Sequence, residues 1–466
     1  MRDKKRRLEF YSYYDYTGIS EHLEKMAKKG WMIESMSNFG WVYRRIEPQN
    51  LKFSVSYFSK ASEFDPEPSD KQKEFIDYCE HTGWKFACSS AQLQVFYNED
   101  ENATPIETDY ELEFETINKS IKKSVLPSYI LLIGVFLLKI IYDINNAIDN
   151  PINYFSHYMN IFSTLCMIFA IVHIVIDITN YYIWYSKVKK ICKYNSSIKS
   201  ANTVLFNRII SYAILSLFGV FLILGLLYAS AIERLSYILI IFFTAILFVI
   251  VTGIKKFLKK KKVCKQVNFT ITMVACTLLY LGIIVGTVFI SIILIKNGFF
   301  DDKKVTKYEY NGHTYSAYNH ELPLTIEDFT GEIYDGYSKE LLEDKTFILE
   351  YIVAYQTPRV DERYSEDMHN LDYEIVNVKC DFIYNMCKNN LIKDNEKHHF
   401  FEQEYIKDNA EAWGANEVYR LYDKQDGYYD DYIVCYDNII LHIDYSGEFT
   451  DDYKKIIGEI ILKKIA

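Results

Sequence analysis

The chain contains five long apolar segments, and the need to keep them out of water limits what it can fold into. At a helical rise of about 1.5 Å per residue, about 20 residues cross a hydrocarbon core of about 30 Å. Few charged residues interrupt the segments, so the sequence predicts a bundle of five transmembrane helices within residues 116–300. The approximate bounds of these helices are 125–142, 158–183, 209–231, 235–254 and 269–295.

The connections between these segments alternate in charge. Lysines precede the first segment in "NKSIKKS", a neutral-to-acidic connection follows it, and the alternation continues to "KKFLKKKKVCK" (255–265) before the fifth. Connections rich in Lys and Arg stay preferentially in the cytoplasm. We therefore expect a multi-pass protein of the cell membrane with a cytoplasmic amino terminus and residues 301–466 outside. "MRDKKRR" continues into "LEFYSYYDY" without the apolar stretch of a secretory signal, which favours the same orientation.

Charge is segregated along the chain. Residues 121–300 hold 18 Lys and Arg against 4 Asp and Glu, whereas residues 301–466 hold 18 against 36. The acidic final block would repel nucleic acid, so no direct nucleic-acid partner is expected. The lysine run 255–265 is expected to set orientation and to contact anionic membrane lipids, and a lipid-sensing switch is the alternative.

Residues 8–97 contain an internal duplication. Each half predicts a strand, a helix and two strands, so that two βαββ repeats form an α+β domain of ferredoxin-like class over residues 1–115. Gly30 and Gly83 stand where a helix ends in a positive-φ residue. Trp31 and Trp84 follow them, and each is expected either to pack against the last helical turn or to contact a ligand or partner.

The repeat resembles a known family. The segments "GISEHLEKMAKKGWMIES" and "FIDYCEHTGWKFACSS" are similar to the bacterial domain of unknown function twenty-eight-twelve, whose members are membrane proteins often encoded beside PadR-like transcriptional regulators. The outer block resembles a carboxy-terminal region of some members through "LPLTIEDFTG" (322–331) and "DNAEAWGANEVYRLYD" (408–423). The resemblance implies no catalytic residues and suggests a transcriptional regulator as partner.

Residues 301–466 predict an acidic extracytoplasmic α+β domain. The predicted order is strands, a helix from Asp381, a three-stranded meander and a closing helix capped by Thr450. The adjacent His398 and His399 cannot both face one ion from a regular element, and the acidic residues around Gly427 lack calcium-loop spacing, so no metal is expected. Trp413 is expected either in the core or on a binding surface.

Ionisable residues also occur inside the second apolar segment. His173 and Asp177 are four residues apart and share a helical face, with Asn180 about one turn further along. Ionisable groups in a span usually face protein or water, so this face is a candidate for a proton or cation pathway. The alternative is that Asp177 and Asn180 lie near the cytoplasmic end of the helix and His173 contacts a neighbouring hydroxyl.

No phosphate-binding glycine loop, nucleophile elbow or paired zinc histidines occur in the sequence, so neither enzymatic activity nor a cofactor is indicated. We expect a membrane sensor or regulatory protein that couples an extracytoplasmic ligand or partner to a cytosolic partner of the 1–115 domain. The alternative is a transporter or an accessory subunit of a transport complex. Five spans are few for a carrier, so that alternative requires a homo-oligomer or a partner permease.

Overall fold

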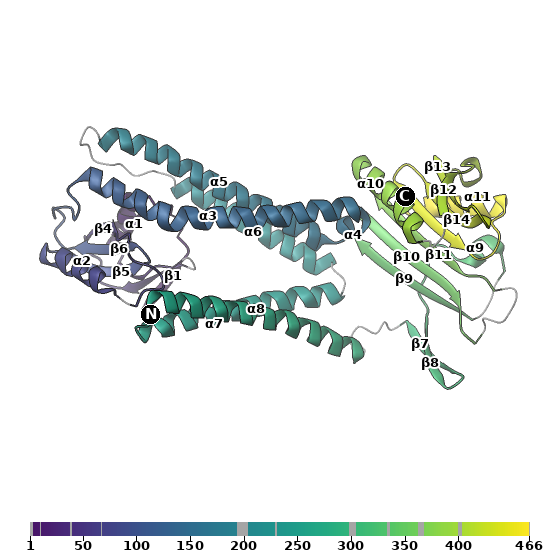
Figure 1. Cartoon of the computed structure of the whole chain (residues 1–466), viewed down its shortest axis with the longest axis horizontal. Coiled ribbons are helices and arrows are strands. Elements are labelled where there is room, and N and C mark those ends of the chain that lie inside the picture. The colour runs from purple at the N-terminus through teal and green to yellow at the C-terminus, as the bar shows by residue number, and fades with distance from the viewer. Residues whose placement is uncertain are drawn as a thin grey trace. The chain divides into compact units, whose positions relative to one another are not determined.

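A computed structural model describes residues 3–9, 11–37, 40–66, 68–192, 204–228, 231–297, 304–332, 336–361, 368–398 and 403–465 (Figure 1). The chain divides into two compact units. The first comprises Met1–Leu138, Cys166–Phe221 and Ile238–Val288. The second comprises Lys139–Leu165, Leu222–Tyr237 and Phe289–Ala466.

Five helices are long and apolar enough to cross a membrane, which makes the chain a multi-pass membrane protein. The first is longer than predicted, because its polar first turns pack on the N-terminal domain through Phe114, Ile117 and Ile121. A short helix α4 (Pro151–Ser156) stands where the sequence predicted only a connection. The long helices are α3 (Tyr110–Asp149), α5 (Tyr158–Cys192), α6 (Val204–Tyr228), α7 (Ala231–Lys260) and α8 (Lys265–Lys296).

The N-terminal domain, from β1 to β6, contains the order strand, helix, strand, strand twice. The first repeat comprises β1 (Lys4–Arg7), α1 (Tyr16–Lys28), β2 (Trp31–Ser35) and β3 (Trp41–Arg45). The second comprises β4 (Lys52–Tyr57), α2 (Asp70–His81), β5 (Lys85–Ser90) and β6 (Leu93–Asn98). The strands form two antiparallel three-stranded sheets, β1-β3-β2 and β4-β6-β5. No strand pairing joins the two sheets within the described residues, so a single ferredoxin-like sheet is not confirmed.

Local sequence signals explain where the two helices of this domain begin and end. The Asp15 side chain accepts a hydrogen bond from the backbone N–H of Gly18, and the Ser69 side chain accepts one from Gln72. Past the helix ends, Gly30 and Gly83 have φ values of 78° and 89°. Residues other than glycine rarely adopt this left-handed backbone region. The positive φ values therefore confirm that the two helices end where the sequence predicts.

One apolar core joins the N-terminal domain to the membrane helices of the first unit. Leu23 on α1 and Tyr43 on β3 belong to the same buried cluster as Ile117 on α3 and Trp184 on α5. The ring of Tyr14 lies 5.3 Å from that of Trp184, centroid to centroid. Removing such aromatic and aliphatic surface from water is the main favourable term in packing. The domain is therefore packed against α3 and α5.

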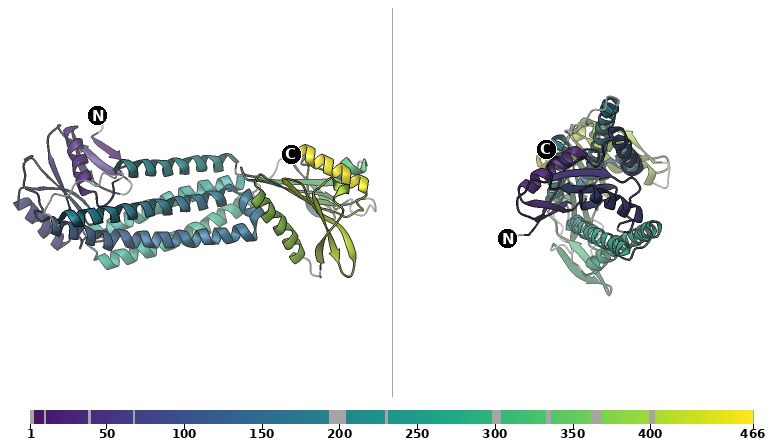
Figure 2. Two further views of the ribbon diagram at one scale, coloured as in Figure 1. Left: turned by 90° about the horizontal axis from the view of Figure 1, so that it is seen from above. Right: turned by 90° about the vertical axis from the view of Figure 1, so that its left-hand side faces the viewer.

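The C-terminal domain, from β7 to α11, is built on a seven-stranded antiparallel sheet with the order β12-β13-β14-β15-β11-β10-β9. Helix α11 (Asp451–Ile465) covers one face and α10 (Asp381–His398) covers the other (Figure 2). The sheet strands are β9 (Tyr337–Lys345), β10 (Leu349–Pro358), β11 (Leu371–Val378), β12 (Gln403–Lys407), β13 (Glu417–Asp423), β14 (Gly427–Cys435) and β15 (Ile439–Tyr445). The remaining elements are the hairpin β7 (Val305–Tyr310) and β8 (His313–Tyr318), α9 (Ile326–Thr330) and the 3-10 turn η1 (Glu411–Trp413).

Alternating side chains fill the two faces of this sheet. Val434 and Leu441 are buried with α11, whereas their chain neighbours Ile433 and Ile440 are buried with α10. Successive side chains of a strand point to opposite faces, so a sheet covered on both sides needs continuous apolar runs. The meander and the closing helix occur as the sequence predicts. The backbone N–H of Tyr453 donates to the Thr450 hydroxyl at 3.2 Å, which confirms the predicted cap.

Candidate functional site

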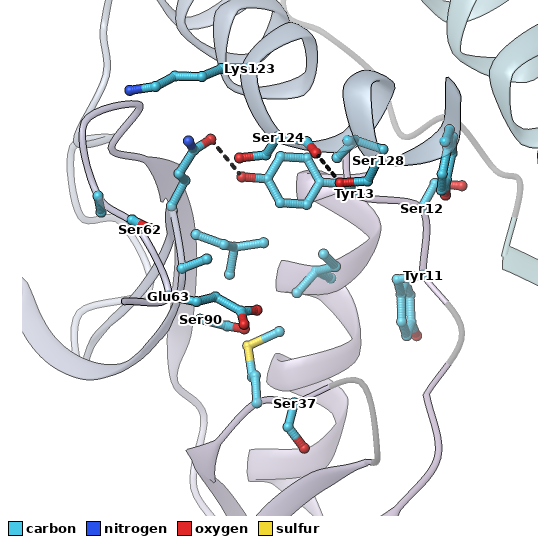
Figure 3. Close-up of a pocket in the computed structure, with 18 of the residues that line it drawn as sticks. Tyr11, Ser12, Tyr13, Ser37, Ser62, Glu63, Ser90, Lys123, Ser124 and Ser128 are labelled. Carbon is cyan, nitrogen blue, oxygen red and sulfur yellow. Dashed lines mark hydrogen bonds between the residues drawn. The ribbon is translucent and has the colours of Figure 1, made fainter. Parts of the chain in front are cut away.

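A cavity of about 770 Å³ with a mixed polar and apolar lining lies within the first unit, between the N-terminal domain and several membrane helices (Figure 3). Serine hydroxyls from separate elements share it, and Figure 3 shows Ser37 across the cavity from Ser124 and Ser128. The serines that line it are Ser12, Ser37, Ser62, Ser90, Ser124, Ser128 and Ser211. We call this space the juxtamembrane cavity.

The juxtamembrane cavity lies where the membrane helices change from polar to apolar. Lys123 and Ser124 come directly before the apolar part of α3, and Lys265 is the first residue of α8. Asp177 lies just past the middle of α5, twelve residues before Lys189 in its final turn.

Asp177 connects the N-terminal domain to helix α3. Its Oδ1 atom accepts a hydrogen bond of 3.1 Å from the Ser12 hydroxyl, and its Oδ2 atom accepts one of 2.8 Å from the Tyr129 hydroxyl. His173 lines the same cavity, whereas Asn180 is not among the lining residues. The structure thus brings His173 and Asp177 to one cavity, as their spacing indicates. Their role in a proton or cation pathway stays a prediction.

Tyrosine and lysine side chains define another part of the cavity. The Tyr13 hydroxyl donates to the Gln92 side chain at 3.3 Å, and burial raises the pKa of Tyr13 well above its usual value. Lys123 donates from Nζ to the Ser59 carbonyl at 2.9 Å. Because Tyr13 stays protonated, its hydroxyl remains a hydrogen-bond donor at neutral pH.

The cavity holds three carboxylates in different electrostatic surroundings. Glu9 has Arg7 and His22 within 3.2 Å, and the nearest Glu63 oxygen lies 2.9 Å from Lys255. Asp177 accepts hydrogen bonds from neutral hydroxyls. Within the described part of the chain no Lys, Arg or His lies within ion-pair distance of Asp177.

The three tryptophans singled out in the sequence occupy different environments. Trp84 and Trp413 are only 2% and 1% exposed, so both are core residues and present no surface to a partner. The indole N–H of Trp84 donates to the Thr104 carbonyl at 3.0 Å. Trp31 is partly exposed, and the cationic groups of Lys5 and Arg45 lie over its ring at 5.4 and 5.2 Å. Of the three, only Trp31 is placed to contact a partner.

Two acidic residues close to Gly427, Asp430 and Asp431, pair with protein side chains. Asp430 lies 2.7 Å from the guanidinium of Arg420, and Asp431 lies 3.0 Å from His442. The predicted histidine pair is not described as a whole, because His399 lies outside the described residues. In the described ranges, no group of three or more His, Cys, Asp or Glu residues is placed to hold a metal ion.

The structure contains a polar network around His442 that the sequence did not predict. Burial alone would lower the pKa of His442, but the carboxylates of Asp431 and Glu374 raise it to about 10. The Tyr405 hydroxyl donates to Asp431 at 2.8 Å, and the Tyr351 hydroxyl donates to Glu374 at 3.0 Å. The available signal was the alternation of His442 with apolar neighbours in "IILHIDY" (439–445), which places it on the α10 face of the sheet.

The fold and the site define a multi-pass membrane protein of mixed α+β class, with folded domains before and after its membrane helices. Within it, residues 15–129 match the family model described as "Protein of unknown function (DUF2812)", so the chain contains this domain. The match begins at the N-cap of α1 and ends inside α3, beyond the boundary near residue 115 expected from the sequence. No curated protein and no solved structure matches the chain significantly.

Proposed function

We propose that this protein is a membrane sensor or regulatory protein that couples an extracytoplasmic ligand or partner to a cytosolic partner of its N-terminal domain. The observation that supports this proposal is the shared core of the first unit. Leu23 of the N-terminal domain, Ile117 of α3 and Trp184 of α5 are buried together in it. A displacement of α3 or α5 would therefore act directly on the packing of the domain.

Helix α3 also provides contacts for the C-terminal domain within the second unit. The Asn390 side chain on α10 donates to the carbonyl of Asp149, the last residue of α3, at 2.8 Å. The Thr346 hydroxyl donates to the Phe155 carbonyl on α4 at 2.7 Å, and Ile152 is buried against the α10 face of the sheet. Ligand binding that displaces α10 would also displace the end of α3, because the two are hydrogen-bonded. Signal transfer along α3 is the mechanism that we propose.

The proposal requires the two folded domains to lie on opposite sides of the membrane. The basic connections support a cytoplasmic N-terminal domain and an extracytoplasmic C-terminal domain. An alkaline phosphatase fused after Ala466 is expected to be active, because this enzyme needs an oxidising compartment. A matched fusion after Lys262, in the lysine run, is expected to be inactive. An inactive fusion after Ala466, with the fused chain present in the membrane, would contradict the orientation.

The proposed cytosolic surface of the N-terminal domain includes Trp31. The two βαββ repeats, which we propose are related to a ferredoxin-like unit, place Trp31 between Lys5 and Arg45. Crosslinking of the full-length protein in its native membrane, followed by mass spectrometry, identifies what contacts this domain. A transcriptional regulator is the partner that the family resemblance suggests. Trp31→Ala is expected to reduce that crosslink, whereas Tyr78→Ala, at an exposed site on α2, is the control.

A transporter or an accessory subunit of a transport complex is the alternative, because His173 and Asp177 of the membrane helix α5 line one cavity. On that proposal the protein acts as a homo-oligomer or with a partner permease. Ion flux through the full-length protein in liposomes is then expected to fall in the His173→Ala, Asp177→Ala double variant. Unchanged flux would dispose of the alternative.

A further inference from the structure

The lining of the juxtamembrane cavity is suited to a small polar ligand. Its volume of about 770 Å³ lies within the range of about 300–1,000 Å³ that small-molecule sites occupy. Serine hydroxyls can each donate and accept hydrogen bonds, so several of them together suit a ligand rich in oxygen atoms. Tyr11 and Trp41, whose rings are stacked at 5.5 Å, add an aromatic wall.

One part of the cavity favours a cation. The carboxylates of Glu9 and Glu63 have basic partners, but among the described residues the partners of Asp177 are the hydroxyls of Ser12 and Tyr129. An ionised carboxylate has about four acceptor positions, and these two hydrogen bonds fill two of them. The free positions suit a group with several N–H donors and a positive charge, such as a primary ammonium.

Another part of the cavity favours an anion. Lys123 and Lys265 both line it, and within the described residues the hydrogen-bond partner of Lys123 is the neutral carbonyl of Ser59. Lys265 has no carboxylate partner within the described residues. Lys123 precedes Tyr129 by six residues on α3, which is about 9 Å along the helix axis. The positive and negative ends of the cavity are therefore separated along α3.

We propose that the juxtamembrane cavity binds a short zwitterion in which a primary ammonium is joined to a phosphate, the chemistry of phosphoethanolamine. The ammonium binds Asp177, the phosphate binds Lys123 and Lys265, and the serine hydroxyls contact the phosphate oxygens. The ligand is supplied by the headgroup of a membrane phospholipid or by a free phosphoamino alcohol. This site does not depend on the sensor role or on the direction in which the chain crosses the membrane.

Soluble probes test the chemistry of the ligand. The full-length protein in detergent, stripped of lipid, is heated with phosphoethanolamine, phosphocholine or inorganic phosphate, and its unfolding midpoint is measured. Phosphoethanolamine is expected to raise the midpoint most, because the quaternary ammonium of phosphocholine has no N–H to donate to Asp177. Equal effects of inorganic phosphate and phosphoethanolamine would overturn the assignment of Asp177.

Vesicles distinguish the two sources of the ligand. The protein is reconstituted into phosphatidylglycerol vesicles that contain either phosphatidylethanolamine or phosphatidylcholine, and the midpoint is measured again. A preference for phosphatidylethanolamine without a response to soluble phosphoethanolamine assigns the site to a lipid headgroup. A response to both phosphatidylethanolamine and soluble phosphoethanolamine shows that the site binds the phosphoethanolamine group from either source. No preference in either experiment overturns the proposal.

A pair of lysine variants separates the cavity from general surface charge. Lys265→Gln is expected to weaken phosphoethanolamine binding about tenfold, which corresponds to about 1.4 kcal/mol. Lys262→Gln, in the same connection but not lining the cavity, is expected to leave binding unchanged. Both side chains are exposed, so neither change threatens folding. Equal losses in the two variants would show that the lysine run attracts phosphate without a site.

Discussion

Replacing Gly458 with alanine tests how closely helix α11 approaches the 3-10 turn η1. A Cβ atom at this position would overlap the backbone carbonyl oxygen of Trp413 and would lie 3.0 Å from the Tyr436 hydroxyl. That hydroxyl donates to the same carbonyl at 3.3 Å. Both partners are held in the core, because Trp413 is 1% and Tyr436 is 4% exposed.

Helix propensity and packing predict opposite signs for this change. Alanine is favoured over glycine inside a helix by about 0.8–1 kcal/mol, so local propensity alone predicts stabilisation. Overpacking a core costs about 1–3 kcal/mol, and loss of the Tyr436 hydrogen bond costs about 1 kcal/mol more. We expect a net loss of about 2 kcal/mol, because the backbone of η1 cannot move aside like a flexible side chain.

Hydrogen exchange in the full-length protein measures this local stability. A loss of about 2 kcal/mol predicts about thirtyfold faster exchange of protected amides in α11 for Gly458→Ala. Glu459→Ala, at the next and exposed position of the helix, is the matched control and is expected to change exchange little. Unchanged or slower exchange in Gly458→Ala would refute the close approach of α11 to η1.

Three further predictions concern other parts of the fold. Gly30→Ala is expected to destabilise the N-terminal domain more than Gly83→Ala. Both variants lose about 1–2 kcal/mol of stability because alanine disfavours positive φ, but only a Cβ at position 30 would meet a backbone oxygen, at 2.8 Å. Thermal unfolding of the two variants measures the difference. His442→Gln is expected to destabilise the C-terminal domain by about 1.5–3 kcal/mol below pH 6.5. The loss becomes progressively smaller as pH rises through about 10, where wild-type His442 loses its proton. Urea titrations at both ends of that range measure the difference in unfolding free energy, and a difference that does not change with pH would contradict the ion pair. Tyr129→Phe removes one donor to Asp177 and is expected to increase exchange in the middle turns of α3 about fivefold, from a loss of about 1 kcal/mol. Equal exchange would contradict a role for this bond in holding α3.

Features that depend on neighbouring residues in the chain were predictable. The five apolar segments identify the membrane helices, because length and apolarity alone decide whether a helix can cross a bilayer. Gly30 and Gly83 mark helix ends, since positive φ is a local backbone property. His173 and Asp177 share a helical face by their spacing, and both line the juxtamembrane cavity.

Features that depend on contacts between distant residues were decided only by tertiary structure. Ser12 and Asp177 are 165 residues apart, and no local pattern shows that one hydroxyl meets the other's carboxylate. Trp84 and Trp413 fit a surface or a core equally well in the sequence, and packing places both inside. The sequence by itself determined which segments enter the membrane and where helices stop, because these follow from short-range sterics and hydrophobicity. Tertiary packing decided that the six N-terminal strands form two sheets and that serines from separate elements share one cavity, because those depend on how the finished elements fit together.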